Sequence, residues 1–274
     1  MTRKPVRRNS KTSKSTPFYW SKPFIVIVIV FILSVFLYTK RDALAYYLSF
    51  KTDRVPLETR QASLSEVIKV HNEKAFGLDV SEYQERINWD LLSDLETGNP
   101  IEFIFIRATA GSNKTDSKFH KYWGKARETN MYQGAYHYYR PNENSIDQAN
   151  NYIKTVKLKK GDFPPVLDIE KLPRHQSIDS LKVGLQRWLD KVEKHYGVKP
   201  IIYSSESYYN DFLKNDFEDY PFWIANYTAF YHDIDSDWSL WQITENGKIE
   251  GIRGCVDVNV YNGTTKDLKE LLMK

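Results

Sequence analysis

Eight short apolar segments, each bounded by turn residues, place the strongest constraint on the fold of this chain. They are rich in Val, Ile, Phe, Tyr and Trp and are typical of β-strands: residues 76–81, 103–109, 132–139, 164–170, 201–204, 222–227, 239–244 and 255–259. After each of the first five there is room for a helix, whereas the last three are separated by only about ten residues, too few for a crossover helix. The pattern predicts an α/β fold, an irregular TIM-like β/α barrel of five βα units followed by three strands.

The five helices are predicted from the segments between these strands, at residues 88–95, 118–130, 146–156, 181–196 and 207–213. The fourth is the clearest, because Leu181, Leu185, Trp188, Leu189, Val192 and Tyr196 form a helical stripe that Gly197 closes.

Four acidic residues, Asp79, Asp168, Glu170 and Asp257, lie late in their predicted strands. Active sites of β/α barrels sit at the carboxyl ends of the strands, so these side chains should converge there. Asp168 and Glu170 are two positions apart, which on a strand puts them on one side, with Cα atoms roughly 6.5 Å apart. A buried carboxyl pair tends to keep one proton, and one protonated acid beside one ionised acid can cleave a glycosidic bond. The alternative is a solvated strand end, or an acid pair matched by Lys or Arg.

Several segments, in this order and spacing, resemble glycoside hydrolase family 25, the Chalaropsis-type lysozymes. They are residues 77–81 (GLDVS), 105–109 (FIRAT), 134–138 (GAYHY) with Arg140 and Pro141, 165–170 (PVLDIE), 200–203 (PIIY), 223–226 (WIAN), 241–242 (WQ) and 256–259 (VDVN). The resemblance covers roughly residues 76–262. It departs from the family at residues 107–111 (RATAG), where many members carry Lys-Ala-Thr-Glu-Gly, so that Ala110 removes an acid.

The resemblance implies an irregular barrel and hydrolysis of the β-1,4 bond between N-acetylmuramic acid and N-acetylglucosamine in peptidoglycan, in cell-wall catabolism or remodelling. It further implies that Glu170 is the proton donor and that Asp79, Asp168 and Asp257 complete the acidic site. We expect the negative charge of Asp168 to raise the pKa of Glu170, and the close spacing to favour retention of configuration with help from the substrate's acetamide group. The alternatives are a catalytically silent, membrane-tethered glycan-binding barrel and an exported glycosidase that acts on a chitin-like polymer.

Aromatic residues make up 15% of the chain and suit a sugar-binding cleft, because sugars stack on aromatic rings. The predicted substrate-binding residues lie near strand ends: Tyr203, Trp223, Tyr227, Trp241, Gln242 and His137. The alternative for each is a place in the barrel core.

Other chemistries find no support in the sequence. The single cysteine, Cys255, excludes a disulfide framework and a cysteine zinc cluster, and no His-Glu-x-x-His, dinucleotide-binding or Walker-type motif is present. We therefore expect no metal and no cofactor.

Residues 1–22 carry seven Lys or Arg and no acid, which gives this tail a charge of +7. The whole chain has a net charge of +4, so the remaining residues carry a net charge of −3. This charge distribution favours attraction of the tail to anionic lipid and argues against nucleic-acid binding by the folded domain.

Residues 23–39 form 17 uncharged, mostly apolar positions between Lys22 and Lys40. At about 1.5 Å per residue they span roughly 26 Å, close to a bilayer core. We predict a basic cytoplasmic tail (1–22), a transmembrane signal-anchor helix (23–39), a stem with a short helix near Val67 and Ile68 (40–74) and a catalytic barrel (75–274). The protein would be a single-pass, monomeric membrane protein with the barrel outside the cytoplasmic membrane. The alternative is secretion after cleavage at residues 43–45 (ALA).

Overall fold

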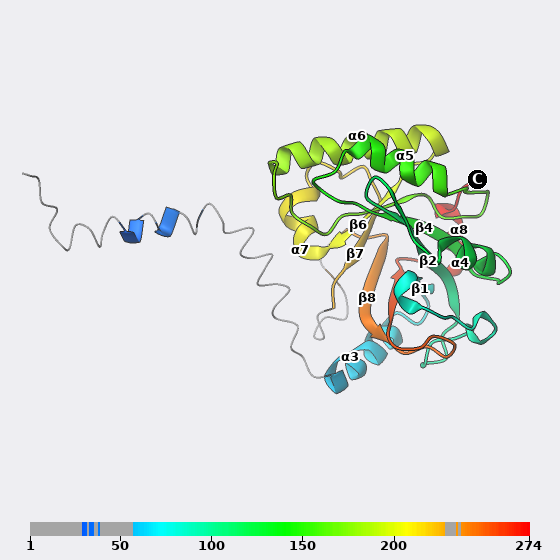
Figure 1. Cartoon of the computed structure of the whole chain (residues 1–274). Helices are drawn as coiled ribbons and strands as arrows, with labels where there is room; N and C mark the ends of the chain where they lie inside the picture. The colour runs from blue at the N-terminus through cyan, green and yellow to red at the C-terminus, as the bar shows by residue number, and fades with distance from the viewer. Residues whose placement is uncertain (1–28, 32, 36–37, 39–56, 228–233, 235–236) are drawn as a thin grey trace, which may run out of the picture. The chain divides into compact units, whose positions relative to one another are not determined.

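The computed structural model describes residues 29–31, 33–35, 38, 57–227, 234 and 237–274 (Figure 1). Most of the predicted anchor, with the basic tail and the possible cleavage site at 43–45, lies outside these residues. The described positions of the anchor are helical. No helix in the described part of the chain is both long and apolar enough to cross a membrane. The anchor and the domain boundaries therefore stay predictions.

Eight of the nine strands in the described residues close into a barrel, because the first strand pairs with both the second and the last. The barrel strands are β1 (Phe76–Val80), β2 (Ile101–Ala110), β4 (Tyr132–Tyr138), β5 (Val166–Asp168), β6 (Ile201–Ser205), β7 (Phe222–Ala225), β8 (Leu240–Gly247) and β9 (Val256–Tyr261). The short β3 (Lys114–Thr115) pairs only with the end of β2. The predicted eight-stranded barrel is confirmed.

The direction of the last strand differs from that of the other seven. All neighbours from β1 to β8 pair in parallel, whereas β9 runs antiparallel to both β8 and β1. A short hairpin connection permits only this direction, since a parallel return would need a crossover of a dozen residues or more. The amino end of β9 therefore lies beside the carboxyl ends of the other strands.

Four of the five predicted helices are present, with shifted ends. They are α4 (Phe119–Ala126), α5 (Ser145–Thr155), α6 (Ile178–Tyr196) and the pair α7 (Glu206–Tyr208) and η3 (Tyr209–Leu213), while α8 (Thr265–Leu271) follows the barrel. In α6 the Ser177 side chain caps the amino end, and Gly197 ends the helix in the left-handed region at φ 71°. The helices α5 and α6 lie side by side outside the barrel (Figure 1).

The helix predicted at residues 88–95 is wrong. The structure has only single 3-10 turns in this connection, η1 (Glu82–Gln84) and η2 (Trp89–Leu91). The backbone of Asp94 pairs instead with Pro100, and Leu95 N–H donates to the Asn99 carbonyl at 2.8 Å. These pairings use the groups that a helix would need, while Leu92 and Leu95 still bury their side chains.

The helix predicted within the stem is confirmed as α3 (Leu57–Val70). Val67 and Ile68 are buried, whereas Val70 is exposed, and the helix packs against β8. The last part of the predicted stem therefore belongs to the packed body of the barrel.

Aromatic side chains fill one end of the barrel interior. Phe103 and Phe105 alternate along β2 with residues that face the helices, and the Phe105 ring stacks on Trp223 at 4.6 Å. A Cβ atom on Gly77 or Gly134 would lie 2.2 to 2.3 Å from these phenyl rings, so both positions require glycine. Trp223 forms the last part of this packed layer. Beyond it, toward the carboxyl ends of the strands, the barrel interior contains a cavity.

Candidate active site

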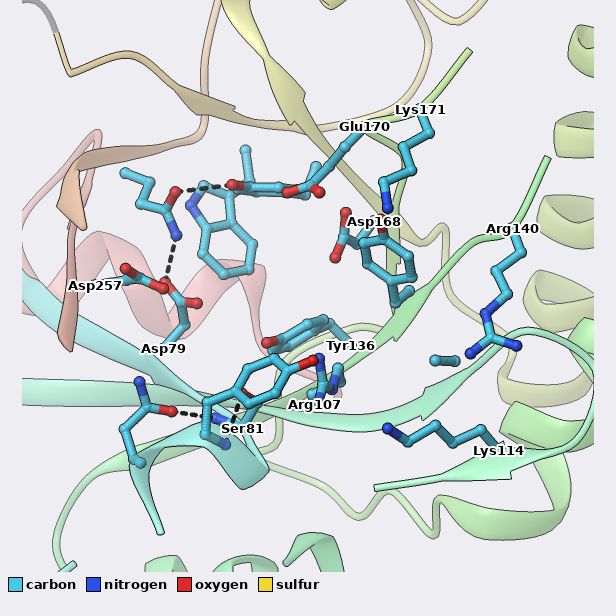
Figure 2. A pocket seen from close by; sticks show the side chains of 17 residues that line it. Asp79, Ser81, Arg107, Lys114, Tyr136, Arg140, Asp168, Glu170, Lys171 and Asp257 are labelled. Atoms are coloured by element: carbon cyan, nitrogen blue, oxygen red, sulfur yellow. Dashed lines mark hydrogen bonds between the residues drawn. The ribbon is translucent and has the colours of Figure 1, made fainter. Parts of the chain in front are cut away.

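The hollow end of the barrel holds a cavity of about 480 Å³. This volume lies within the range of about 300–1,000 Å³ that is usual for ligand pockets. All four predicted catalytic acids, Asp79, Asp168, Glu170 and Asp257, line it (Figure 2).

Asp79 and Asp257 reach the cavity from adjacent strands that run in opposite directions. They are directly paired in the register of β1 and β9. Asp79 is the fourth residue of β1, but Asp257 is the second residue of β9. The prediction that Asp257 lies late in its strand is therefore wrong, and its convergence with the other acids depends on the reversed direction of β9.

Asp168 and Glu170 come from the end of β5. Asp168 is its last residue, and the Ile169 N–H continues the strand course by donating to the Tyr203 carbonyl at 2.9 Å. The two acids therefore point to the same side, and both carboxyl groups reach into the cavity (Figure 2). Asp168 is 5% exposed, and its Oδ1 atom has no hydrogen-bond partner among the described residues.

Two side-chain amides fix the carboxylate of Asp79. Gln242 Nε2 donates to Asp79 Oδ2 at 2.7 Å, and Asn259 Nδ2 donates to the same oxygen at 2.9 Å. Behind them, the Tyr203 hydroxyl donates to Gln242 Oε1 at 2.8 Å, and the Trp223 indole N–H donates to Asn259 Oδ1 at 2.9 Å. The amide orientations follow from these partners, so Asp79 is held at the end of two hydrogen-bonded chains.

The pKa values of the four acids are raised, chiefly by burial. Burial and the charge of Asp79 raise the pKa of Asp257 well above its usual range, so Asp257 keeps its proton and donates it to Asp79. Burial also raises the pKa of Asp79, although the hydrogen bonds from Asn259, Gln242 and Asp257 oppose that shift and favour its ionised form.

The pKa of Asp168 is raised well above its usual range by burial and by the charges of Glu170 and Asp79. The pKa of Glu170 is raised as predicted, but its largest cause is burial, and the charge of Lys171 opposes the shift. The expectation that the charge of Asp168 raises the pKa of Glu170 is therefore wrong, because the carboxylates that add to the effect of burial are Asp79 and Glu245. Burial of both groups makes this pair hold a proton in the free protein.

Four of the six predicted substrate-binding residues lie at the cavity or directly behind it. Tyr203, Trp223 and Gln242 line the cavity. Tyr227 lies behind it, where its hydroxyl donates to Gln242 Oε1.

His137 and Trp241 lie away from the cavity. His137 is fully buried, contacts Thr109 Oγ1 at 2.7 Å and stacks on Trp188. Burial lowers its pKa to about 4, so it is neutral. Trp241 donates its indole N–H to the Asn226 carbonyl at 2.9 Å and packs beside Trp238. Both side chains face the outer layer because they alternate with inward-facing neighbours on their strands.

The fold and this geometry agree with comparisons against known proteins. Residues 78–252 match the sequence profile of the glycosyl hydrolases family 25, which is well over half of the chain. The chain belongs to glycosyl hydrolase family 25. It is therefore a glycoside hydrolase.

Relatives support this family 25 assignment. The chain is 40% identical over 195 residues to the uncharacterized protein YegX of Escherichia coli K12, a match that covers 70% of this chain and 71% of that one. It is 29% identical over 210 residues to Lysozyme M1 of Streptomyces globisporus, with 71% and 70% covered. Among solved structures, a family 25 glycosyl hydrolase from Bacillus anthracis matches with a TM-score of 0.66 and 30% identity, over 74% of this chain and 95% of that chain.

The other residues that line the cavity of this family 25 barrel were not predicted from the sequence. They are Ser81, Tyr83, Gln84, Arg107, Ala110, Lys114, Tyr136, Tyr138, Arg140 and Lys171. A signal existed for Tyr136 and Tyr138, because they alternate with the inward-facing Gly134 along β4. Lys114 gave no such signal, since its place depends on the short β3 pairing. In the described part of the chain, no group of three or more His, Cys, Asp or Glu side chains is arranged to hold a metal ion.

Proposed function

We propose that this family 25 enzyme is an N-acetylmuramidase that hydrolyses the β-1,4 bond between N-acetylmuramic acid and N-acetylglucosamine in peptidoglycan. The observation that carries the proposal is the convergence of Asp79, Asp168, Glu170 and Asp257 in one cavity at the carboxyl ends of the barrel strands. The names of two relatives, an autolytic lysozyme of Clostridium acetobutylicum and Lysozyme M1, support the same activity.

Glu170 acts as the general acid in this proposal. Burial raises its pKa above the usual range of a glutamic acid, which favours the protonated form that a general acid needs. The proton passes to the glycosidic oxygen as the bond to the anomeric carbon breaks. Lys171 limits the rise in pKa, so the same carboxylate can accept a proton from the incoming water in the second step.

Asp168 orients the acetamide group of the sugar. Asp168 lines the cavity, where its carboxylate can accept the acetamide N–H. That hydrogen bond stabilises the ionised form of Asp168, so the proton shared by the pair moves to Glu170 when substrate binds. The acetamide carbonyl oxygen then bonds to the anomeric carbon as the leaving oxygen departs, and water later opens this ring from the opposite side. Two inversions give net retention of configuration.

Asp79 and Asp257 hold the remaining side of the site. Asp257 donates its proton to Asp79, and the two amides donate to Oδ2 of Asp79. This arrangement keeps one negative charge beside the sugar, where positive charge develops in the transition state. The rings of Trp223, Tyr136 and Tyr138 line the cavity and offer stacking surfaces for the sugars.

We further propose that the enzyme remains anchored by residues 23–39 with the barrel outside the cytoplasmic membrane. The asymmetry between the basic residues 1–22 and the apolar segment supports this orientation. The anchor would hold the enzyme near the polymer that it cleaves.

Mass spectrometry of fragments from purified peptidoglycan tests the activity. After borohydride reduction, we expect new reducing ends to appear as the alcohol of N-acetylmuramic acid, with Glu170→Gln as the inactive control. Reduced N-acetylglucosamine ends would show that the other glycosidic bond of peptidoglycan is cleaved, and cleavage of chitin in preference to peptidoglycan would point to the chitin-like substrate. An absence of fragments from folded wild-type protein would point to a silent glycan-binding barrel.

A further inference from the structure

The cavity is divided electrostatically. Asp79 and Asp257 lie at one side in Figure 2, while Lys114 and Arg140 lie at the other. The proposed mechanism uses the acidic side and leaves most of the basic side without a role. Four cations line the cavity: Arg107, Lys114, Arg140 and Lys171.

Arg107 is largely neutralised by the protein itself. Its guanidinium donates to Asp116 Oδ2 at 2.9 Å and to Glu82 Oε1 at 3.0 Å. Lys114 also pairs with Glu82 and is the main reason that the pKa of Glu82 falls to about 2. Neither of these two carboxylates lines the cavity, so they orient the cations from behind.

Arg140 and Lys171 keep donors available. Arg140 makes one ion pair, from Nη1 to Glu143 Oε1 at 3.1 Å, and its side chain is 40% exposed. Its other guanidinium N–H groups have no partner among the described residues. Lys171 has no ion pair in that part of the chain, and its Nζ lies 5.5 Å from the centre of the Tyr138 ring. Three carboxylates, Asp116, Glu82 and Glu143, pair with Arg107, Lys114 and Arg140, while the charge of Lys171 acts on Asp168 and Glu170.

Ala110 marks the centre of the basic side. It pairs with Lys114 in β3 and with Tyr138 in β4, the ring beneath Lys171. A Cβ atom on the next residue, Gly111, would lie 2.7 Å from Arg140 Cδ. Lys114 is thus a strand neighbour of Ala110, Lys171 lies over the ring of another strand neighbour, and Arg140 lies beside the residue that follows it. The Ala110 side chain supplies no carboxylate at this point of the lining, so the cations stay open to an external anion.

We propose that Lys171, Arg140 and Lys114, around Ala110, form a subsite for one carboxylate of the substrate. The proposal deepens the muramidase function and rests on it. The planar fork of Arg140, with N–H groups that have no partner among the described residues, suits a carboxylate. Four acids line the same cavity and would repel a doubly charged phosphate more strongly than a monoanion. The carboxylate has two sources in peptidoglycan, the free lactyl group of a muramic acid without peptide and the carboxylates of a stem peptide.

The test compares Ala110→Glu with Ala110→Gln in the full-length protein, because the two substitutions add similar bulk and differ in charge. KM is measured on three GlcNAc–MurNAc tetrasaccharides: one with free lactyl carboxylates, one with the lactyl groups capped as neutral alanine amides, and one with peptides whose carboxylates are free. We expect Ala110→Glu to raise KM about tenfold over Ala110→Gln where the carboxylate is bound. On the neutral glycan the two variants should agree within about twofold.

The pattern across the glycans identifies the source. An effect on the free lactyl glycan assigns the sugar carboxylate, and an effect only on the peptide-bearing glycan assigns the stem. Equal KM values for the two variants on all three glycans would overturn the subsite, even when wild-type protein cleaves them all. Should wild-type protein cleave none, the muramidase proposal fails, and Kd values from quenching of tryptophan fluorescence decide the subsite by the same comparison. If neither variant folds, Arg140→Gln, measured on the charged and neutral glycans, gives the same decision.

Discussion

Gln242→Glu should convert the hydrogen bond that orients Asp79 into a pH-dependent one. Gln242 accepts from the Tyr203 and Tyr227 hydroxyls and donates through Nε2 to Asp79 Oδ2 at 2.7 Å. A glutamic acid at this position keeps the shape and the acceptor. It can donate to Asp79 only while it is protonated.

The separation sets the size of the effect. Two unit charges 2.7 Å apart repel by about 6 kcal/mol at an effective dielectric constant of about 20. The introduced carboxyl therefore has a raised pKa in the folded protein, against an unfolded value of about 4.3. A pKa that is raised in the folded state contributes to stability. This contribution is fully present at pH values below the pKa of the unfolded state, and it is lost as the pH rises through the pKa of the folded state. We expect the variant to resemble the wild type at acidic pH and to lose about 10²-fold in kcat/KM, relative to wild type, by pH 8.

The assay is peptidoglycan hydrolysis from pH 4.5 to 8.5, with thermal melting at the same pH values. Gln242→Met is the matched control, because it removes the charge-assisted hydrogen bond without adding a charge. It should lower the free energy of unfolding by about 2 kcal/mol, or Tm by about 4–8 °C, at every pH. A Gln242→Glu profile parallel to that of the wild type across this range would refute the coupling of Gln242 to an ionised Asp79.

Four further predictions address other parts of the site and chain. Glu170→Gln should lower turnover by roughly 10²-fold or more with unchanged melting, and near-normal hydrolysis would remove its role as general acid. NMR of the first-formed sugar should show the β-anomer; an α-anomer would exclude retention. N-terminal sequencing of protein from cells should find the uncleaved chain, whereas a start at Tyr46 would establish a cleaved leader. Trp223→Phe should raise KM, while Trp241→Phe should lower Tm and leave KM unchanged, and the reverse pattern would contradict the placement of the two rings.

Local sequence patterns were sufficient to predict much of the fold. The stripe of α6, with Ser177 before it and Gly197 after it, combines apolar periodicity with both capping signals. The strand-end acids were also found, because β/α barrels place such residues at one end. The helix predicted at residues 88–95 is wrong because this segment buries its apolar side chains as a loop, and its backbone groups pair outside the segment.

Direction and side-chain facing were harder to predict. Whether Asp257 lies at the start or the end of β9 depends on pairing with β8 and β1, which local composition does not encode. His137 illustrates the difficulty of predicting which way a side chain faces. A shift of one residue would point His137 into the cavity and turn Tyr136 and Tyr138 away from it. Gly134 shows which side of β4 faces the barrel interior, because the Phe105 ring lies against it. That contact is visible only in the structure.

The reversed direction of β9 also has a practical consequence. The only cysteine of the chain, Cys255, is exposed and lies two residues before Asp257, just ahead of the first residue of β9. A thiol-reactive fluorophore would therefore attach at one position of the unmodified protein, close to the acids that we propose as catalytic. Such a label would report the arrival and departure of glycan strands in real time, without any engineered residue.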